Sequence, residues 1–138
     1  MGKNIAAGIA GIAVALVLVM LAEMLGHTVY PPPADLDFDD IDAVRSHIAT
    51  LPVGAFAFVA GGWFAATLAG ILVACRIGTA RKRFFASMIT GLMLLATVYN
   101  LATIPHPLWF SIVGIAGIFL AAWLALCLSP ADRETNPE

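Results

Sequence analysis

Residues 4–25 read NIAAGIAGIAVALVLVMLAEML, and Glu23 is the only charged side chain among these 22 residues. A helix rises about 1.5 Å per residue, so roughly 20 apolar residues cross a hydrocarbon core of about 30 Å. The run lacks the polar–apolar alternation of a membrane β-strand. It is also about twice as long as the apolar part of a signal peptide, and no A-x-A pattern follows it. The stretch therefore predicts a retained transmembrane helix.

Three further apolar runs of similar length occupy residues 51–74, 84–104 and 108–128. Lipid offers no hydrogen-bond partners, so each run is expected to pair its backbone internally as a helix. Of the 138 residues, 61% are hydrophobic and 12% are charged, which excludes a typical soluble or disordered chain. A net charge of −2 argues against a nucleic-acid partner. The predicted fold is all-α: one transmembrane domain over residues 1–138, built as an antiparallel four-helix bundle in a lipid bilayer.

The basic residues fall almost entirely on one side of the predicted bundle. Six of the seven lie before residue 4, between 74 and 84, or after 128, and only Arg45 lies in the 26–50 loop. Cytoplasmic segments of membrane proteins carry the excess of Lys and Arg. We therefore expect both termini in the cytoplasm and the 26–50 loop outside.

The 26–50 loop is predicted to contain a short amphipathic helix. Pro31, Pro32 and Pro33 favour a stiff polyproline II segment. Downstream, apolar residues recur at helical spacing and Asp37 is a plausible N-cap, which predicts a short surface helix over about residues 38–50.

Rows of small residues at four-residue intervals indicate where helix backbones approach closely. These rows are Ala7, Gly11 and Ala15; Gly62, Ala66, Gly70 and Ala74; and Gly117, Ala121 and Ala125. They can pack helices within the bundle, or form the interface of a homodimer or of a complex with another membrane protein. Trp63 lies beside Gly61 and Gly62, and we expect its ring to pack over this exposed backbone, with stacking against a ligand as the alternative.

A polar cluster is predicted at the outer end of the bundle. Glu23 and His27 are four residues apart and share one helix face. His106 lies between two prolines in the very short turn that follows residue 104, and Asn100 lies about one helical turn earlier. His47, in the surface helix, is on the same side.

Three interpretations of this cluster stay open. Glu23, His27, Asn100 and His106 can hydrogen-bond to one another and cap helix ends, since polar groups near the interface are inexpensive. Glu23, His27 and His106 can instead bind a metal, or the histidines a haem. Alternatively, Glu23 and His27 can relay protons during transport of a small solute. The identity of any cofactor is not determined by the sequence.

Catalytic motifs are not apparent. The chain contains no G-x-S-x-G turn and no Gly-rich phosphate loop with Lys. Cys75 and Cys127 fall on the side opposite every histidine, so no Cys–His pair and no structural disulfide is expected. The leading functional prediction is an accessory or structural membrane protein that is not an enzyme. The second is a binding or transport protein that uses Glu23, His27 and His106.

Three segments carry a resemblance: EMLGHTVYPPPADLDF (23–38), LPVGAFAFV (51–59) and NLATIPHPLWF (100–110). The chain resembles a family of small four-span bacterial membrane proteins of unassigned function, and the GHTVYPPP and PHPLWF segments are the most specific. The resemblance implies a location in the bacterial plasma (inner) membrane and carries no activity.

Overall fold

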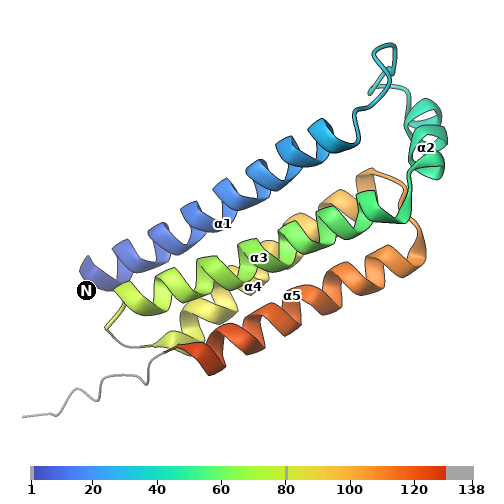
Figure 1. Cartoon of the computed structure of the whole chain (residues 1–138). Coiled ribbons are helices and arrows are strands. Elements are labelled where there is room, and N and C mark those ends of the chain that lie inside the picture. The colour runs from blue at the N-terminus through green and yellow to red at the C-terminus, as the bar shows by residue number, and fades with distance from the viewer. Residues whose placement is uncertain (1, 80, 130–138) are drawn as a thin grey trace, which may run out of the picture.

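The computed structural model describes residues 2–79 and 81–129, which form five α-helices and no strand (Figure 1). Four long helices lie side by side, and a short one lies beside one end of the bundle. The helices are α1 (Gly2–Val29), α2 (Ile41–Thr50), α3 (Val53–Ile77), α4 (Lys82–Thr103) and α5 (Leu108–Leu128). The long helices are each long and apolar enough to cross a membrane. The predicted four-helix fold is confirmed.

The helix ends differ from the apolar runs by a few residues. The 108–128 span agrees with α5, but α1 continues beyond residue 25 to Val29, and the Tyr30 amide still donates to the Gly26 carbonyl at 2.8 Å. α3 begins two residues later than the run because Pro52, which has extended backbone angles, is its N-cap. α1 therefore extends beyond its apolar run, whereas α3 begins only after the extended residue Pro52.

The start of the short surface helix was predicted at the wrong aspartate. The Asp37 carboxylate accepts the Asp39 amide at 2.9 Å, which makes a local turn before the helix. Asp40 is the N-cap, and its carboxylate accepts the amides of Asp42 and Ala43 at 2.9 and 3.2 Å. α2 therefore covers residues 41–50 rather than 38–50.

α3 is the central helix of the bundle. It packs against α1, α4 and α5, whereas α1 barely meets α4 and does not contact α5. The arrangement is a three-helix group of α3, α4 and α5 with α1 attached to the outside of α3 (Figure 1).

Small residues permit the close approach of α1 and α3. A Cβ added to Gly11 would lie 2.6 Å from the Gly70 carbonyl oxygen, and one added to Gly70 would lie 2.8 Å from the Gly11 carbonyl oxygen. Closer to the α2 end, a Cβ on Gly62 would lie 2.5 Å from the Cβ of Ala22. The two backbones are therefore in direct contact at Gly11 and Gly70, as small residues allow in membranes.

The contact face of α5 is turned away from one of the predicted small residues. Ala121 and Ala125 are fully buried, and so is Ala66 on α3. Gly117 is different, because no neighbouring atom lies within 4 Å of where its Cβ would be. Gly114 makes the close contact instead, because a Cβ added there would lie 2.9 Å from the ring of Trp63. Two residues of the predicted row on α5 therefore lie on the packing face, and Gly114 takes the place predicted for Gly117.

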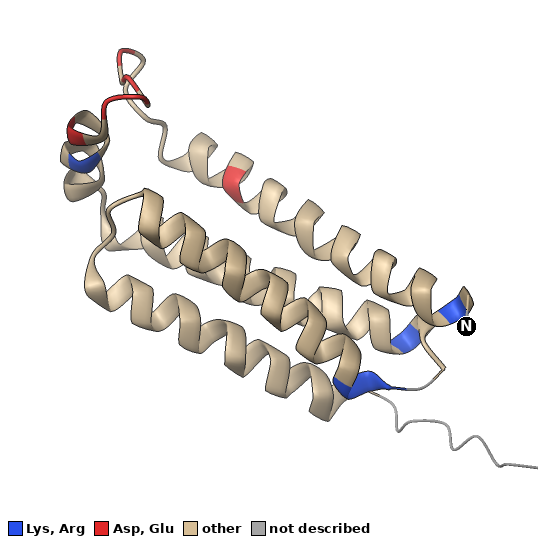
Figure 2. Cartoon of the chain, turned by 180° about the vertical axis from the view of Figure 1, so that it is seen from behind, with Lys and Arg blue, Asp and Glu red and all other residues tan. Residues whose placement is uncertain are grey.

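The outer surface of the long helices is apolar between two charged ends. Large hydrophobic side chains are exposed on all four, including Ile5, Met24, Leu95 and Phe119. Figure 2 shows Lys and Arg gathered at the end that holds the N-terminus, and Asp gathered around α2 at the other end. Glu23 interrupts the apolar stretch of α1. This distribution fits a multi-pass helical membrane protein.

Candidate functional site

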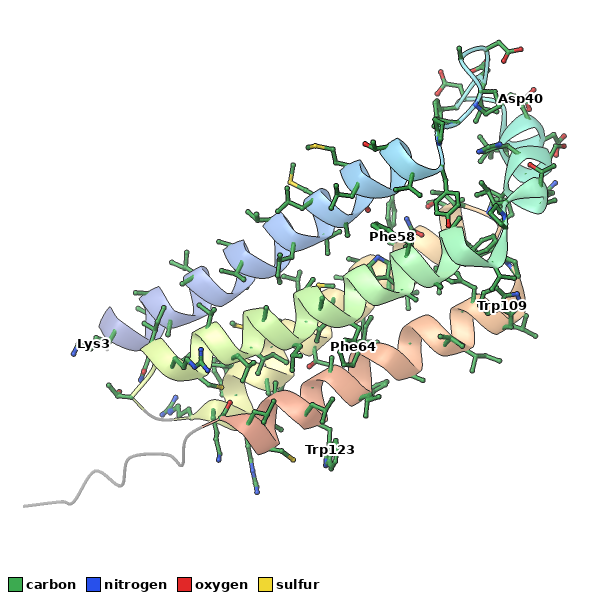
Figure 3. All side chains as sticks on the ribbon, in the orientation of Figure 1. Lys3, Asp40, Phe58, Phe64, Trp109 and Trp123 are labelled. Carbon is green, nitrogen blue, oxygen red and sulfur yellow. The ribbon has the colours of Figure 1, made fainter. Side chains whose placement is uncertain are left out.

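A pocket of about 420 Å³ lies at the α2 end of the bundle, hereafter the α2-end pocket. All five helices and the loop before α2 contribute lining residues. Glu23, His27, Asn100 and His106, the four residues of the predicted polar cluster, all line it. Side chains of this end, such as Asp40 and Trp109, lie far from Lys3 at the other end (Figure 3). The structure therefore brings the predicted residues to one cavity.

α1 supplies the acidic wall of the pocket. Glu23 and His27 lie one turn apart on α1, and both are exposed. Glu23 is six residues from the end of the helix, or about 9 Å along its axis. α1 is held beside α3 at this level by the contact of Gly26 with the Phe58 ring and by the approach of Tyr30 to Gly54. A carboxylate is thus placed within a membrane-length helix and on the lining of a cavity.

His106 is held in one orientation by its turn. Its Nδ1 lies 2.7 Å from the Ile104 carbonyl oxygen, which can only accept, so Nδ1 carries the proton. The imidazole ring stacks on Phe110, with centroids 5.0 Å apart and planes 23° apart. Burial lowers the pKa of His106 below its ordinary value of 6.5, against a smaller opposing effect of the Ile104 hydrogen bond. The neutral ring then leaves Nε2 as a hydrogen-bond acceptor.

An aromatic wall forms the α3–α5 side of the pocket. Phe110 is fully buried and lies at its centre, with ring centroids 5.3 Å from Trp63 and 5.4 Å from Phe56. Trp63 lies against Gly114 of α5, not over Gly61 and Gly62 as expected, because its side chain points across to the neighbouring helix. Such offset and tilted ring pairs stabilise one another beyond simple burial.

α2 covers the open end of the cavity with its apolar face. The pocket is lined by Val44, His47 and Ile48, which are three and four residues apart and so lie on one face of α2. None of the residues of α2 is buried. α2 is thus a partly exposed side of the pocket, whereas the aromatic wall is buried.

The polar residues do not bond to one another. Within residues 2–79 and 81–129, Glu23 and His27 have no hydrogen-bond or ion-pair partner, and His106 bonds to a backbone carbonyl. The expected network among Glu23, His27, Asn100 and His106 is therefore not formed. These groups face the cavity with free hydrogen-bonding capacity.

A three-ligand metal site is not assembled either. In the part of the chain that the structure describes, no group of three or more His, Cys, Asp or Glu side chains is close enough to hold a metal ion. Glu23, His27 and His106 share the pocket without converging on one point.

Several of the lining residues were not assigned to a site by the sequence analysis. Tyr30, Phe56 and Trp63 line the pocket, and His47 does so from α2. His47 could have been found from its position beside Ile48 on the apolar face of the predicted surface helix. Trp63 was singled out by its place beside two glycines, for which ligand stacking was one alternative, whereas Phe56 had no such signal, because aromatic side chains in a span are usually packed against other helices or lipid.

No protein-family model matches the chain, and no curated protein or solved structure matches it significantly.

Proposed function

We propose that this is a small accessory membrane protein without catalytic turnover, and that its α2-end pocket binds a small, largely apolar molecule. The observation that carries the proposal is that polar side chains that do not bond to one another line a single cavity, whose other lining residues are mainly apolar and aromatic. Ligand sites in proteins have this composition, with volumes of roughly 300–1,000 Å³. The cavity volume of about 420 Å³ falls in this range.

Residues that serve nucleophilic catalysis are separated in the molecule. Cys75 and Cys127 lie near the ends of α3 and α5 that are remote from the pocket, and Cys75 is buried. A thiol needs a base within hydrogen-bond reach to act as a nucleophile, and the three histidines line the pocket at the other end. This separation supports binding without turnover.

The proposed location is the bacterial plasma (inner) membrane, with the N- and C-termini in the cytoplasm. Its support is the charge distribution: Lys3, Arg76, Arg81, Lys82 and Arg83 lie at one end, and Arg45 alone lies at the other. The pocket then faces the outer side. A reporter enzyme that is active only outside should work when inserted at residue 35 and fail when fused after residue 138; the reverse pattern would invert the orientation.

The binding function can be tested on the protein purified in its native lipids. Native mass spectrometry is expected to detect a bound small molecule on the wild type. Val59 lines the pocket and Val53 is exposed on the same helix, so Val59→Trp should lose the bound molecule and Val53→Trp should keep it. Ala55→Leu is a second pocket-filling variant if Val59→Trp does not fold. No bound molecule on the wild type, or equal occupancy in both tryptophan variants, would refute the proposal.

Proton-coupled transport of a small solute is a second candidate, and the place of Glu23 in a membrane-length helix favours it. For the protein in liposomes, Glu23→Gln should then abolish the pH-dependent flux of the solute. His47→Gln should leave most of that flux. An unchanged flux in Glu23→Gln would remove this candidate.

A further inference from the structure

The charges that line the α2-end pocket are of one sign. Glu23 is the only carboxylate on the lining, and no Lys or Arg is found among the described lining residues. The Glu23 carboxylate has no partner within the described part of the chain. The exposed Glu23 carboxylate is therefore available to pair with a cation that enters the pocket.

Aromatic rings line the same pocket as this carboxylate. Tyr30, Phe56, Trp63 and Phe110 contribute rings to the lining. The faces of such rings attract organic cations, because the ring quadrupole places negative charge on each face. The same rings supply the apolar surface that a hydrocarbon body needs, so one cavity offers both an anion and an aromatic enclosure.

The approach to the pocket is also negative. Five aspartates lie between residues 35 and 42, in the loop before α2 and at the start of α2. The guanidinium of Arg45 is bound to one of them, Asp42, at 2.8 Å. The acidic residues gather at the α2 end in Figure 2. A surface of one sign raises the local concentration of the opposite charge and steers its association.

We infer that the α2-end pocket selects hydrophobic organic cations, that is, ammonium compounds with an aromatic or alkyl body, with Glu23 as the counter-ion. The inference rests on the proposed binding function and names the class of its ligand. In this arrangement the cationic head pairs with Glu23 and the apolar body contacts the wall formed by Phe56, Trp63 and Phe110. His106 Nε2, as an acceptor, does not oppose a bound positive charge.

Two probes of the same shape separate charge from hydrophobicity. Benzyltrimethylammonium carries a quaternary nitrogen, and neopentylbenzene has a carbon atom in its place. Equilibrium dialysis against lipid nanodiscs of zwitterionic lipid, with and without the full-length protein, measures binding of each probe after subtraction of partitioning into lipid. The cation should bind the wild type about fivefold more tightly than the neutral isostere, because only the cation pairs with the exposed Glu23 carboxylate.

Variants identify the residue that is responsible. Glu23→Gln should weaken binding of the cation about fivefold and leave binding of the neutral isostere unchanged. Asp35→Asn is the matched control, because Asp35 belongs to the acidic loop but does not line the pocket, and its effect should stay below about twofold at physiological salt. Since Glu23 is exposed, the glutamine variant places no new demand on packing.

The outcomes distinguish this inference from the function on which it rests. If the neutral isostere binds the wild type as tightly as the cation, or if Glu23→Gln retains the preference, the cation inference is overturned while pocket binding stands. If neither probe binds, the cation inference is overturned too, and the mass-spectrometric comparison of Val59→Trp with Val53→Trp decides the binding function separately.

Discussion

The contact between Gly11 and Gly70 makes a quantitative prediction about how α1 is held. Replacing Gly11 with Ala puts a methyl group 2.6 Å from the Gly70 carbonyl oxygen and 2.8 Å from both the Ala74 Cβ and the Ile89 Cδ1. Ordinary contacts begin near 3.4 Å, and two of these three neighbours are backbone or Cβ atoms that cannot rotate away. The helices must therefore separate by several tenths of an ångström.

Overpacking of this kind costs about 1–3 kcal/mol. The higher helix propensity of alanine returns up to about 1 kcal/mol, so we expect a net loss of about 1–2 kcal/mol in the free energy of unfolding. The matched control is Gly61→Ala on α3, because nothing lies within 4 Å of a Cβ at Gly61. This control should be neutral or slightly stabilising.

Unfolding in mixed micelles with increasing mole fraction of sodium dodecyl sulfate, followed by tryptophan fluorescence, measures both free energies. Gly11→Ala should unfold at a lower fraction than the wild type, and Gly61→Ala should not. Equal stability of the two alanine variants would refute the direct backbone contact between α1 and α3.

Three further predictions concern α2, the turn before α5 and the start of α4. Asp40→Ala removes the N-cap of α2 and should cost that helix about 1 kcal/mol, seen as faster amide exchange over residues 42–50, whereas Asp35→Ala should leave exchange there unchanged. Burial lowers the pKa of His106, so the unfolded chain takes up the proton first, and the free energy of unfolding should fall as pH drops through 6.5. His106→Gln should lose this part of the pH dependence; an identical profile would contradict the assignment. Arg81 adopts a left-handed conformation with φ of 69°, so Arg81→Gly should stabilise the fold by about 1 kcal/mol in the same micelle titration.

The long helices could be predicted from the sequence because the bilayer leaves few alternatives. A backbone without water must pair internally, so a run of about 20 apolar residues specifies a helix. The start of α2 could not be settled in this way. Asp37 and Asp40 both satisfy the preference for an N-cap, and only the structure shows that the first closes a local turn and the second caps the helix.

Helix pairing was less predictable than helix position. Small-residue rows occur on three spans, and periodicity alone does not show which rows meet. A shift of three residues separates Gly117 from Gly114, and this shift rotates the packing face enough to exchange their roles. The polar cluster was located because helix direction and charge place Glu23, His27 and His106 at one end. The aromatic wall, by contrast, depends on side chains from α3 and α5 that meet only in three dimensions.

The central place of α3 has a consequence for biosynthesis. A ribosome delivers α1 and α3 before α5, and α1 and α3 share a backbone contact that needs no later helix. Phe110 emerges last among the residues of the aromatic wall, and His106, which stacks on it, emerges just before. A nascent chain halted before residue 104 would thus present the indole of Trp63 to lipid or to a chaperone, and arrival of the final segment completes the cavity.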